Sequence, residues 1–190
     1  MPERRRGAVR SEAARTSILT ATARLFAERG YDHLSIESIA AAAGVGKQTI
    51  YRWWPSKGFL VAECLLEGML LPERLEPPDT GDLRTDLISW LEEIFRVLES
   101  PNGEGLMRSL IAAAAENDEV GKRLGASLGG LSLMSRINAQ DEASGISPGA
   151  AREIVEALVG AVVMRALSRT PIESGDAERL VQAVLGVAVS

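Results

Sequence analysis

The sequence predicts an all-α protein made of a small N-terminal part and a larger C-terminal part. Apolar residues recur at helical spacing in one segment after another, and helix caps and glycine or proline stops separate these segments. Residues 1–60 hold 10 Lys and Arg against 5 Asp and Glu, whereas residues 61–190 hold 11 against 21. The charge split separates a basic N-terminal part from an acidic remainder. Together with the caps and stops, it divides the chain into a flexible basic arm at residues 1–10, an N-terminal helical domain at residues 11–71 and a C-terminal domain at residues 72–190.

Composition narrows the class of protein. With 190 residues, 46% hydrophobic and 25% charged, the chain has the length and balance of a soluble globular protein with a substantial core. It has no apolar run of the ~18 residues that span a bilayer and no signal-peptide segment, so we expect no membrane partner and a cytoplasmic location. Cys64 is the single cysteine, which excludes an internal disulfide. Together with the single histidine, His33, it provides too few ligands for a Cys/His metal site, so no cofactor is expected. We expect His33 at the surface or in a hydrogen bond.

The N-terminus combines a basic segment with a first helix. Arginines crowd the first ten residues together with Pro2 and Gly7, which favours a flexible arm. One interpretation is that the arm contacts DNA, at phosphates or in a narrow minor groove. The other is that it is only a solvated tail. From Ser11 to Arg29 the apolar residues follow a helical period, and Gly30 is the predicted stop.

Two short helices are predicted to meet at a tight corner. Ser35 is the N-cap of the first, whose apolar residues are spaced as on one helix face. Gly44 ends it, because glycine readily adopts the left-handed conformation. Val45, Ile50 and Trp54 then restart the pattern on the inner face of a second helix.

The outward face of the second helix suggests a function. Lys47, Gln48, Tyr51 and Arg52 fall on one side of it, opposite Ile50 and Trp54. In the major groove of DNA, glutamine can pair with adenine and lysine or arginine with guanine or phosphate. The pattern indicates a helix-turn-helix with residues 47–54 as the recognition helix. The alternative is an ordinary helical hairpin with a solvated polar face.

A fourth helix is predicted after this motif. Pro55 ends the recognition helix, and Ser56 caps a new helix of about 15 residues that runs to Pro72. The backbone N–H groups at its start, together with Lys57, could hold a phosphate beside the groove. The length of the helix would carry it from the DNA surface into the body of the protein.

The succession of these motifs resembles the N-terminal domain of the TetR family of transcriptional regulators. It comprises the helix end LFAERGY at residues 25–31, the segment 35–44, the segment VGKQTIYRWW at residues 45–54 and PSK at residues 55–57. The resemblance covers about residues 11–65. It implies an all-helical homodimer with one DNA-binding domain per subunit and a divergent C-terminal domain that dimerises and holds a small inducer. It also implies a repressor that releases its operator when the ligand binds.

The resemblance also implies roles for individual residues. Ser35 and Lys57 match positions that contact phosphates, and the start of the recognition helix matches positions that face bases: Lys47, Gln48 and Thr49. The next positions match residues that hold phosphates or flank the groove: Tyr51, Arg52 and Trp53. Trp54 and Phe59 match core positions. This sequence departs from the family in its adjacent tryptophans and in Gly58, which stands where an acidic residue is frequent.

The C-terminal domain is predicted to hold further helices after a linker at residues 71–82. An amphipathic helix follows over residues 83–98, and Pro101-Asn102-Gly103 breaks it before a helix that reaches Glu116. A further helix begins near Asp118. It contains four glycines, which indicate either a mobile helix near a pocket or close packing through small residues: Gly121, Gly125, Gly129 and Gly130.

The last two helices are predicted to form a dimer interface. They begin at Ser147-Pro148 and at Asp176, and apolar residues cover more of each helix than a single core contact needs. We expect them to form an intersubunit four-helix bundle. The expected contacts are Ile154, Val155, Leu158, Val162, Leu180 and Val184, so that a charge at Val162 should give monomers.

No group of residues in the sequence forms a catalytic constellation, so the chain is not expected to be an enzyme. The remaining alternatives are a repressor that a small apolar ligand releases from a palindromic operator and a constitutive dimeric DNA-binding protein without a ligand. Five large, adaptable residues are candidates for lining a ligand pocket: Met69, Trp90, Met107, Met134 and Met164. Each of them could equally be plain core packing.

Overall fold

The computed structural model describes residues 3–70, 77–100, 103–127, 131–139 and 149–187, and in these ranges the chain is helical and contains no strand. This confirms the predicted all-α class. The helices are α1 (Glu3–Arg29), α2 (Ile36–Ala43), α3 (Lys47–Tyr51), α4 (Lys57–Leu66), α5 (Leu83–Glu99), α6 (Gly103–Glu116), α7 (Asp118–Gly125), α8 (Leu131–Asn138), α9 (Ala151–Ser168) and α10 (Asp176–Val187). None of the helices described is long and apolar enough to cross a membrane.

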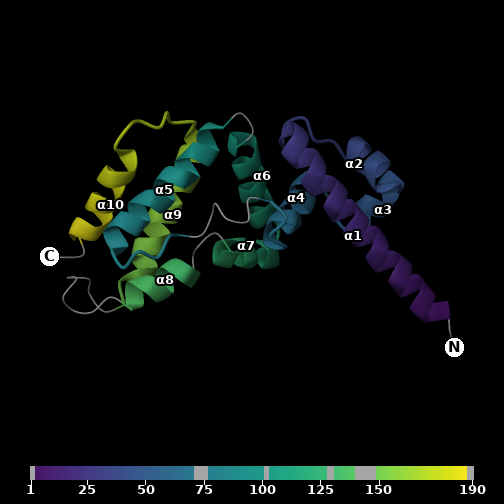
Figure 1. Cartoon of the computed structure of the whole chain (residues 1–190), viewed down its shortest axis with the longest axis horizontal. Coiled ribbons are helices and arrows are strands. Elements are labelled where there is room, and N and C mark those ends of the chain that lie inside the picture. Colours follow the sequence, from purple (N-terminus) through teal and green to yellow (C-terminus); the bar gives the residue numbers. More distant parts are fainter. Residues whose placement is uncertain (1–2, 71–76, 101–102, 128–130, 140–148, 188–190) are drawn as a thin grey trace.

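The helices form a small head, α1–α4, and a larger body, α5–α10 (Figure 1). Helix α2 packs beside α1 and α3 beside α2, whereas α4 is the part of the head that faces the body and contacts both α6 and α7. In the body, α5, α9 and α10 lie against one another, and α8 packs on α9. The head therefore joins the body mainly through α4.

Helix α1 is longer than the sequence predicts. It begins at Glu3, so residues 3–10 are helical and the expected flexible arm is wrong for them. Arginine, glutamate and alanine are all good helix formers, and they outweigh the cost of about 1 kcal/mol for Gly7 in a helix interior. At about 1.5 Å per residue the helix is roughly 40 Å long. Its N-terminal half extends away from the rest of the molecule (Figure 1).

Helices α3 and α4 are shorter than the sequence predicts. Helix α3 ends at Tyr51, and the N–H groups of Trp53 and Trp54 both donate to the carbonyl of Ile50 at 2.9 Å. Helix α4 ends at Leu66 and does not continue to residue 72. Gly68 has a φ of 68°, in the left-handed region that glycine adopts at helix ends.

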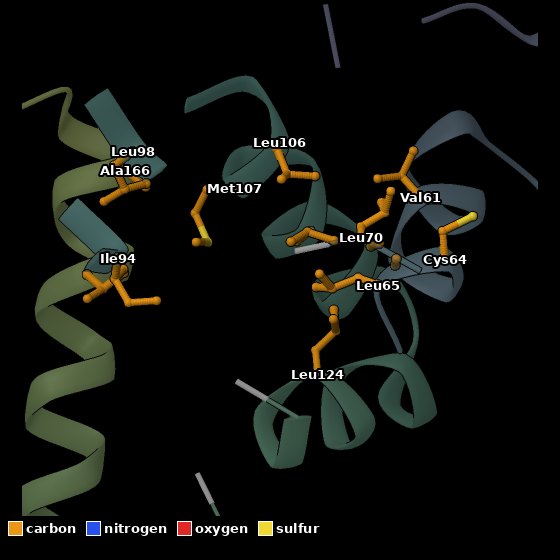
Figure 2. Close-up of a cluster of buried hydrophobic side chains, with 14 of the residues drawn as sticks. Val61, Cys64, Leu65, Leu70, Ile94, Leu98, Leu106, Met107, Leu124 and Ala166 are labelled. Atoms are coloured by element: carbon orange, nitrogen blue, oxygen red, sulfur yellow. The ribbon is translucent and has the colours of Figure 1, made fainter. Parts of the chain in front are cut away.

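The hydrophobic core is continuous from the head to the body. At their junction, buried residues of α4 meet those of α6 and α7, and α6 in turn packs against α5 and α9 (Figure 2). This cluster includes Val61, Cys64, Leu65, Ile94, Leu98, Leu106, Met107 and Ala166. Burial raises the pKa of Cys64 to about 12, so the thiol packs in the core as a small apolar group. Rigid-body movement of the head would disturb this shared core.

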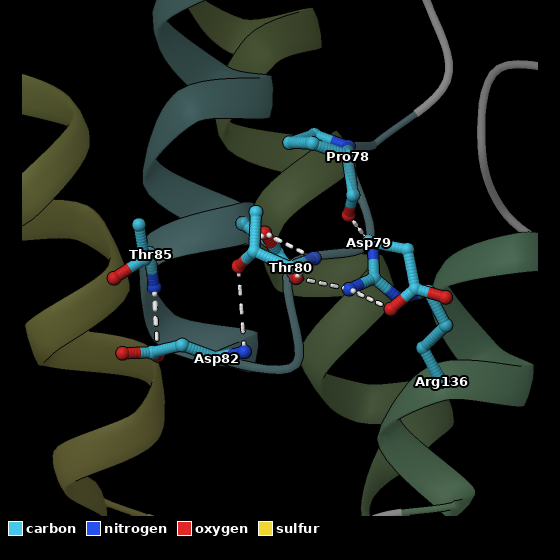
Figure 3. A network of polar contacts seen from close by, with 7 residues as sticks. Pro78, Asp79, Thr80, Asp82, Thr85 and Arg136 are labelled. Carbon is cyan, nitrogen blue, oxygen red and sulfur yellow. Dashed lines mark hydrogen bonds and ion pairs between the residues drawn. The ribbon is translucent and has the colours of Figure 1, made fainter.

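A buried carboxylate attaches the segment before α5 to the body (Figure 3). Asp86 on α5 is fully buried and accepts hydrogen bonds from the N–H (3.1 Å) and the hydroxyl (2.7 Å) of Thr80. The guanidinium of Arg136 on α8 donates to Asp86 and to the carbonyl of Pro78, and lies 3.2 Å from Asp79. These contacts connect α5, α8 and the segment before α5.

Close packing explains one of the four glycines that follow residue 118. A Cβ added to Gly121 would lie 3.1 Å from the carbonyl oxygen of Ala114, so glycine lets α7 approach α6 closely. An added Cβ at Gly125 would meet no atom within 4 Å. Gly129, Gly130 and the predicted helix start at Ser147-Pro148 lie outside the described residues.

The structure corrects the expected dimer contacts on α9. Ile154, Val155, Leu158 and Val162 are all at most 7% exposed and face the interior of the subunit. They are therefore core residues and cannot form a partner surface. On α10, the other two expected contacts are half-buried: Leu180 and Val184. The outward face of α9 instead carries the apolar side chains of Met164 and Leu167, 61% and 50% exposed.

Candidate nucleic-acid interface

Local hydrogen bonds shape the α2–α3 hairpin. The hydroxyl of Ser35 accepts from the N–H of Ser38 at 3.1 Å, and the hydroxyl of Ser38 accepts from the N–H of Ser35 at 3.3 Å, which forms a capping box at the start of α2. Gly44, with a φ of 67°, ends the helix, and the N–H of Val45 donates to the carbonyl of Ala40 at 3.0 Å. The predicted cap and stop are both confirmed.

Helix α3 presents a polar face over a buried apolar one. Ile50 is fully buried and Trp54 is 2% exposed, so these two residues fix the helix to the head. The side chains of the opposite face are all exposed: Lys47, Gln48, Tyr51 and Arg52. Thr49 is half-buried beside them. This is the division of faces that the helical spacing predicts.

Lys47 is paired with a residue that the sequence did not single out. Its ammonium lies 2.9 Å from the carboxylate of Glu37 on α2, and both side chains are exposed. The hydrogen bond lowers the pKa of Glu37 and raises that of Lys47. Because exposed ion pairs are weak, a DNA phosphate or base could replace Glu37 as the partner of Lys47.

Two residues predicted to contact phosphates are used inside the protein. The hydroxyl of Ser35 belongs to the capping box of α2. The ammonium of Lys57 donates to the carbonyls of Tyr31 and Leu34, both at 3.0 Å, and lies 4.0 Å from the centre of the Tyr31 ring. Burial lowers the pKa of Lys57. Lys57 thus holds the turn between α1 and α2, and two of its three N–H donors are occupied.

Trp53 lies at the edge of the predicted DNA-binding surface. Its side chain is 37% exposed, and its ring centre is 6.1 Å from that of Trp54. It lines a groove that extends towards α7. The ring is therefore accessible from the side of the body, which the resemblance did not indicate.

Residues far apart in the sequence support the recognition helix from behind. The indole N–H of Trp54 donates to Glu63 on α4, and the other carboxylate oxygen of Glu63 accepts from Arg15 on α1. The separation of Arg15 and Glu63 is 48 residues, so no local pattern could have shown the pair. This chain of contacts connects α1 and α4 to the end of α3.

The turn between α1 and α2 also touches the body. The hydroxyl of Tyr31 donates to the hydroxyl of Ser109 on α6. A Cβ added to Gly58 would lie 2.6 Å from the same Ser109 oxygen, so a larger residue there would require the Ser109 side chain to move. One added to Gly105 would lie 2.4 Å from the carboxylate of Asp32. Small residues therefore allow α6 to lie directly against the head.

The five predicted pocket residues lie in different surroundings. They are not among the residues that line the hollows at the α5–α9 end, beside Trp53 or next to the start of α10. Trp90 and Met107 are buried in the core, Met69 and Met134 are half-buried, and Met164 is 61% exposed on α9. Met164 faces outwards, which corrects its expected place in a pocket.

Comparisons with known proteins agree with this architecture. Residues 18–64 match the family of bacterial regulatory proteins called the tetR family, and residues 77–184 match the tetracyclin repressor-like C-terminal domain. An uncharacterized HTH-type transcriptional regulator of Mycobacterium tuberculosis is 44% identical over 81 residues, which are 43% of this chain and 39% of that protein. The regulator YdeS of Bacillus subtilis is 32% identical over 116 residues, 61% of this chain and 57% of that protein. The matched segments thus span about two fifths to three fifths of these relatives.

Solved structures extend the similarity to nearly the whole chain. The crystal structure of the TetR family transcription regulator SCO0332 superimposes with a TM-score of 0.69 at 29% identity, covering 91% of this chain and 97% of that one. The structure of NalD from Pseudomonas aeruginosa, described as the secondary repressor of the MexAB-OprM multidrug efflux pump, gives 0.50 at 26% identity, covering 93% and 95%. The helix-turn-helix head and the helical body each match a model of this family. Members of the family are regulators and not enzymes. The chain therefore belongs to the TetR family of bacterial regulatory proteins.

Proposed function

We propose that this protein is a sequence-specific DNA-binding transcriptional repressor that acts in the cytoplasm as a homodimer and leaves its operator when a small molecule binds the body. The observation that carries DNA binding is the exposed face of α3. There, Lys47, Gln48, Tyr51 and Arg52 stand over a buried Ile50. A helix with exposed donors on one face and a fixed apolar base is suited to the major groove.

The polar side chains of α3 divide by position. Lys47, Gln48 and Thr49 lie at the start of the helix, where a helix-turn-helix places its base-reading residues. Tyr51 and Arg52 lie at its end, where contacts to phosphate are expected. Because Lys57 already binds two main-chain carbonyls, we assign it a supporting role in place of the predicted phosphate contact.

The outward faces of α9 and α10 support a homodimer. Small and apolar residues form a stripe on α9 that faces away from the core: Ala157, Gly160, Met164 and Leu167. On α10, Leu180 and Val184 are half-buried and Ala183 is exposed. Four helices from two subunits could bury these faces together. Two heads related by a two-fold axis would read two half-sites of a palindromic operator.

Contacts between the head and α6 support control by a ligand. Tyr31 and Ser109 are hydrogen-bonded, and Gly105 lies close against Asp32, so a movement of α6 would shift the turn that leads into α2. A ligand that bound only the shifted form would lower the population able to bind DNA. The alternative is a constitutive DNA-binding dimer without a ligand.

Selection from a pool of random double-stranded DNA tests sequence-specific binding. The wild-type protein should enrich a palindromic sequence, and Gln48→Ala should relax the preference at particular base pairs by about 1–3 kcal/mol. Arg52→Ala should weaken binding to all sequences and reduce the salt dependence by about one unit of slope. Lys122→Ala, which removes an exposed cation on α7, is the control and should change neither. Failure to enrich any sequence would contradict the proposal.

A further inference from the structure

A groove of about 480 Å³ lies between the end of the helix-turn-helix and the body. Its walls come from the residues that follow α3, from α4 and from the α6–α7 corner. We call it the tryptophan groove and define it by Trp53, Trp54, Pro55, Phe59, Glu63, Leu66, Glu116, Asn117, Glu119, Val120 and Arg123. Its volume falls in the range of about 300–1,000 Å³ that holds small molecules.

Aromatic and apolar groups form one side of the groove. Trp53 is 37% exposed although it is a large apolar residue, and its ring is tilted by 35° from that of Trp54. Trp54 is fixed by its hydrogen bond to Glu63, and Phe59 is half-buried beside it. The accessible indole therefore stands on a rigid base and needs little reorganisation to receive a ligand.

Carboxylates outnumber cations in the groove. Three carboxylates but only one guanidinium, that of Arg123, line the groove. Arg15 pairs with Glu63 from outside the groove, so Glu116 and Glu119 are the acidic groups on the side of the body. The face of an indole ring and nearby carboxylates both attract a cation, whereas they repel an anion.

We propose that the tryptophan groove binds lipophilic organic cations, with the aromatic part of the ligand against Trp53 and its positive charge towards Glu116 and Glu119. The combination of an exposed indole, an apolar wall and excess negative charge is suited to this chemical class and not to neutral or anionic molecules. The site lies on the surface between head and body, apart from the interior of the body where the pocket residues were expected.

Occupation of the groove would connect the two parts of the molecule. Trp53 follows α3 directly, whereas Glu116 and Glu119 belong to the α6–α7 corner, so a ligand between them would restrain the head relative to the body. This site goes beyond the proposed repressor function. Its existence can be measured on the protein without DNA, so the failure of either proposal leaves the other standing.

Isothermal titration calorimetry of the full chain with two probes of the same shape tests the site. Tetraphenylphosphonium is a lipophilic cation with four phenyl groups, and tetraphenylborate is its anionic counterpart. We expect saturable binding of tetraphenylphosphonium, at one per chain and below about 1 mM, and binding of tetraphenylborate that is at least about tenfold weaker. Equal affinity for the two ions, or no saturable binding of the cation, would overturn the proposal.

Substitutions locate the binding site. Trp53→Leu and the double variant Glu116→Gln/Glu119→Gln should each weaken tetraphenylphosphonium binding by about tenfold. The control is Glu92→Gln/Glu178→Gln, which removes two exposed carboxylates from another acidic hollow that contains no tryptophan. The control should bind like the wild type. Circular dichroism confirms folding, and the Glu→Gln variant keeps the test valid should Trp53→Leu unfold. Unchanged binding in the folded groove variants, or equal loss in the control, would place the cation elsewhere.

Discussion

At the scale of single residues, Lys57 shows how a cation near a DNA-binding surface can serve the fold. Its ammonium donates to the carbonyls of Tyr31 and Leu34 and lies over the Tyr31 ring. Leaving a partly buried carbonyl without a donor costs about 1–3 kcal/mol. The side chain therefore stabilises the turn from which α2 starts.

Replacing this lysine should destabilise the protein even without DNA. We expect Lys57→Met to lower the free energy of unfolding by about 1–2 kcal/mol, because the substitution keeps the length of the chain but removes the donors. Urea denaturation followed by circular dichroism measures the effect. Lys122→Met, at an exposed position on α7, should change it by less than about 0.5 kcal/mol. Equal stabilities of wild type and Lys57→Met would contradict the supporting role and would favour a contact between Lys57 and a DNA phosphate.

The carboxylate of Asp86 depends on its partners. Burial alone would raise its pKa, but hydrogen bonds from Thr80 and the guanidinium of Arg136 outweigh burial and lower it below the ordinary value of 3.8. A carboxyl with a lowered pKa stabilises the folded state above the pKa of the unfolded chain. This stabilisation is lost as the pH falls below about 4 and through the lowered value.

Removing the guanidinium should leave this charge buried and poorly paired. We expect Arg136→Met to lower the free energy of unfolding at pH 7 by about 2–4 kcal/mol. The difference from wild type should shrink below about pH 4, where Asp86 takes up a proton in the variant and its burial costs less. Denaturation at a series of pH values checks both points. Arg96→Met, which breaks the pair of the exposed Arg96 with the half-buried Glu93, should cost much less at every pH.

At the scale of the elements, the corner between α5 and α6 has room only for glycine. A Cβ added to Gly103 would lie 1.6 Å from the main-chain carbonyl oxygen of Val97, and backbone cannot move aside as a flexible side chain can. The breaker segment predicted from residues 101–103 thus has a steric reason at its last residue. The corner determines where α6 lies relative to α5.

Filling this corner should destabilise the body. Gly103→Ala should lower the melting temperature and cost at least about 2 kcal/mol, since the two helices must separate to admit the methyl group. Gly125→Ala is the matched control, because an added Cβ there meets nothing within 4 Å. The control should be neutral or stabilising by up to about 1 kcal/mol, as alanine favours helix over glycine. A melting temperature unchanged in Gly103→Ala would contradict the close approach.

At the scale of the whole molecule, the outward face of α9 is the proposed place of dimerisation. Met164 and Leu167 are 61% and 50% exposed, whereas Val162 is 6% exposed and packs inside the subunit. A carboxylate in the centre of an apolar interface costs several kcal/mol unless it is paired. Substitutions at these positions should therefore have different effects.

Sedimentation equilibrium distinguishes the two faces. Met164→Glu should give folded monomers, whereas Val162→Glu should unfold the subunit. Ser89→Glu adds one carboxylate at an exposed position of α5 and should remain dimeric. Persistence of the dimer in Met164→Glu would place the interface outside this face of α9.

The sequence by itself determined the features that depend on near neighbours. Helical period, the cap at Ser35 and the stop at Gly44 act within a few residues, so α2, the α2–α3 corner and the exposed face of α3 were predictable. The amphipathic spacing of α5 was also sufficient to predict its buried side. The start of α1 and the end of α4 were not predictable from the sequence. A helix end that frays and one that continues for another turn differ only slightly in free energy.

Tertiary structure alone decided which of several suitable faces was buried. Helix α9 is apolar on more than one side, and only the packing of α5, α6, α8 and α10 against it shows that Val162 faces inwards and Met164 outwards. The partners of Lys57 lie in the turn between α1 and α2, and Arg15, a partner of Glu63, lies on α1, so all of them are distant in the sequence. The physical reason is that a helix pattern specifies how apolar a face is, while the neighbour that covers it depends on the arrangement of the whole chain.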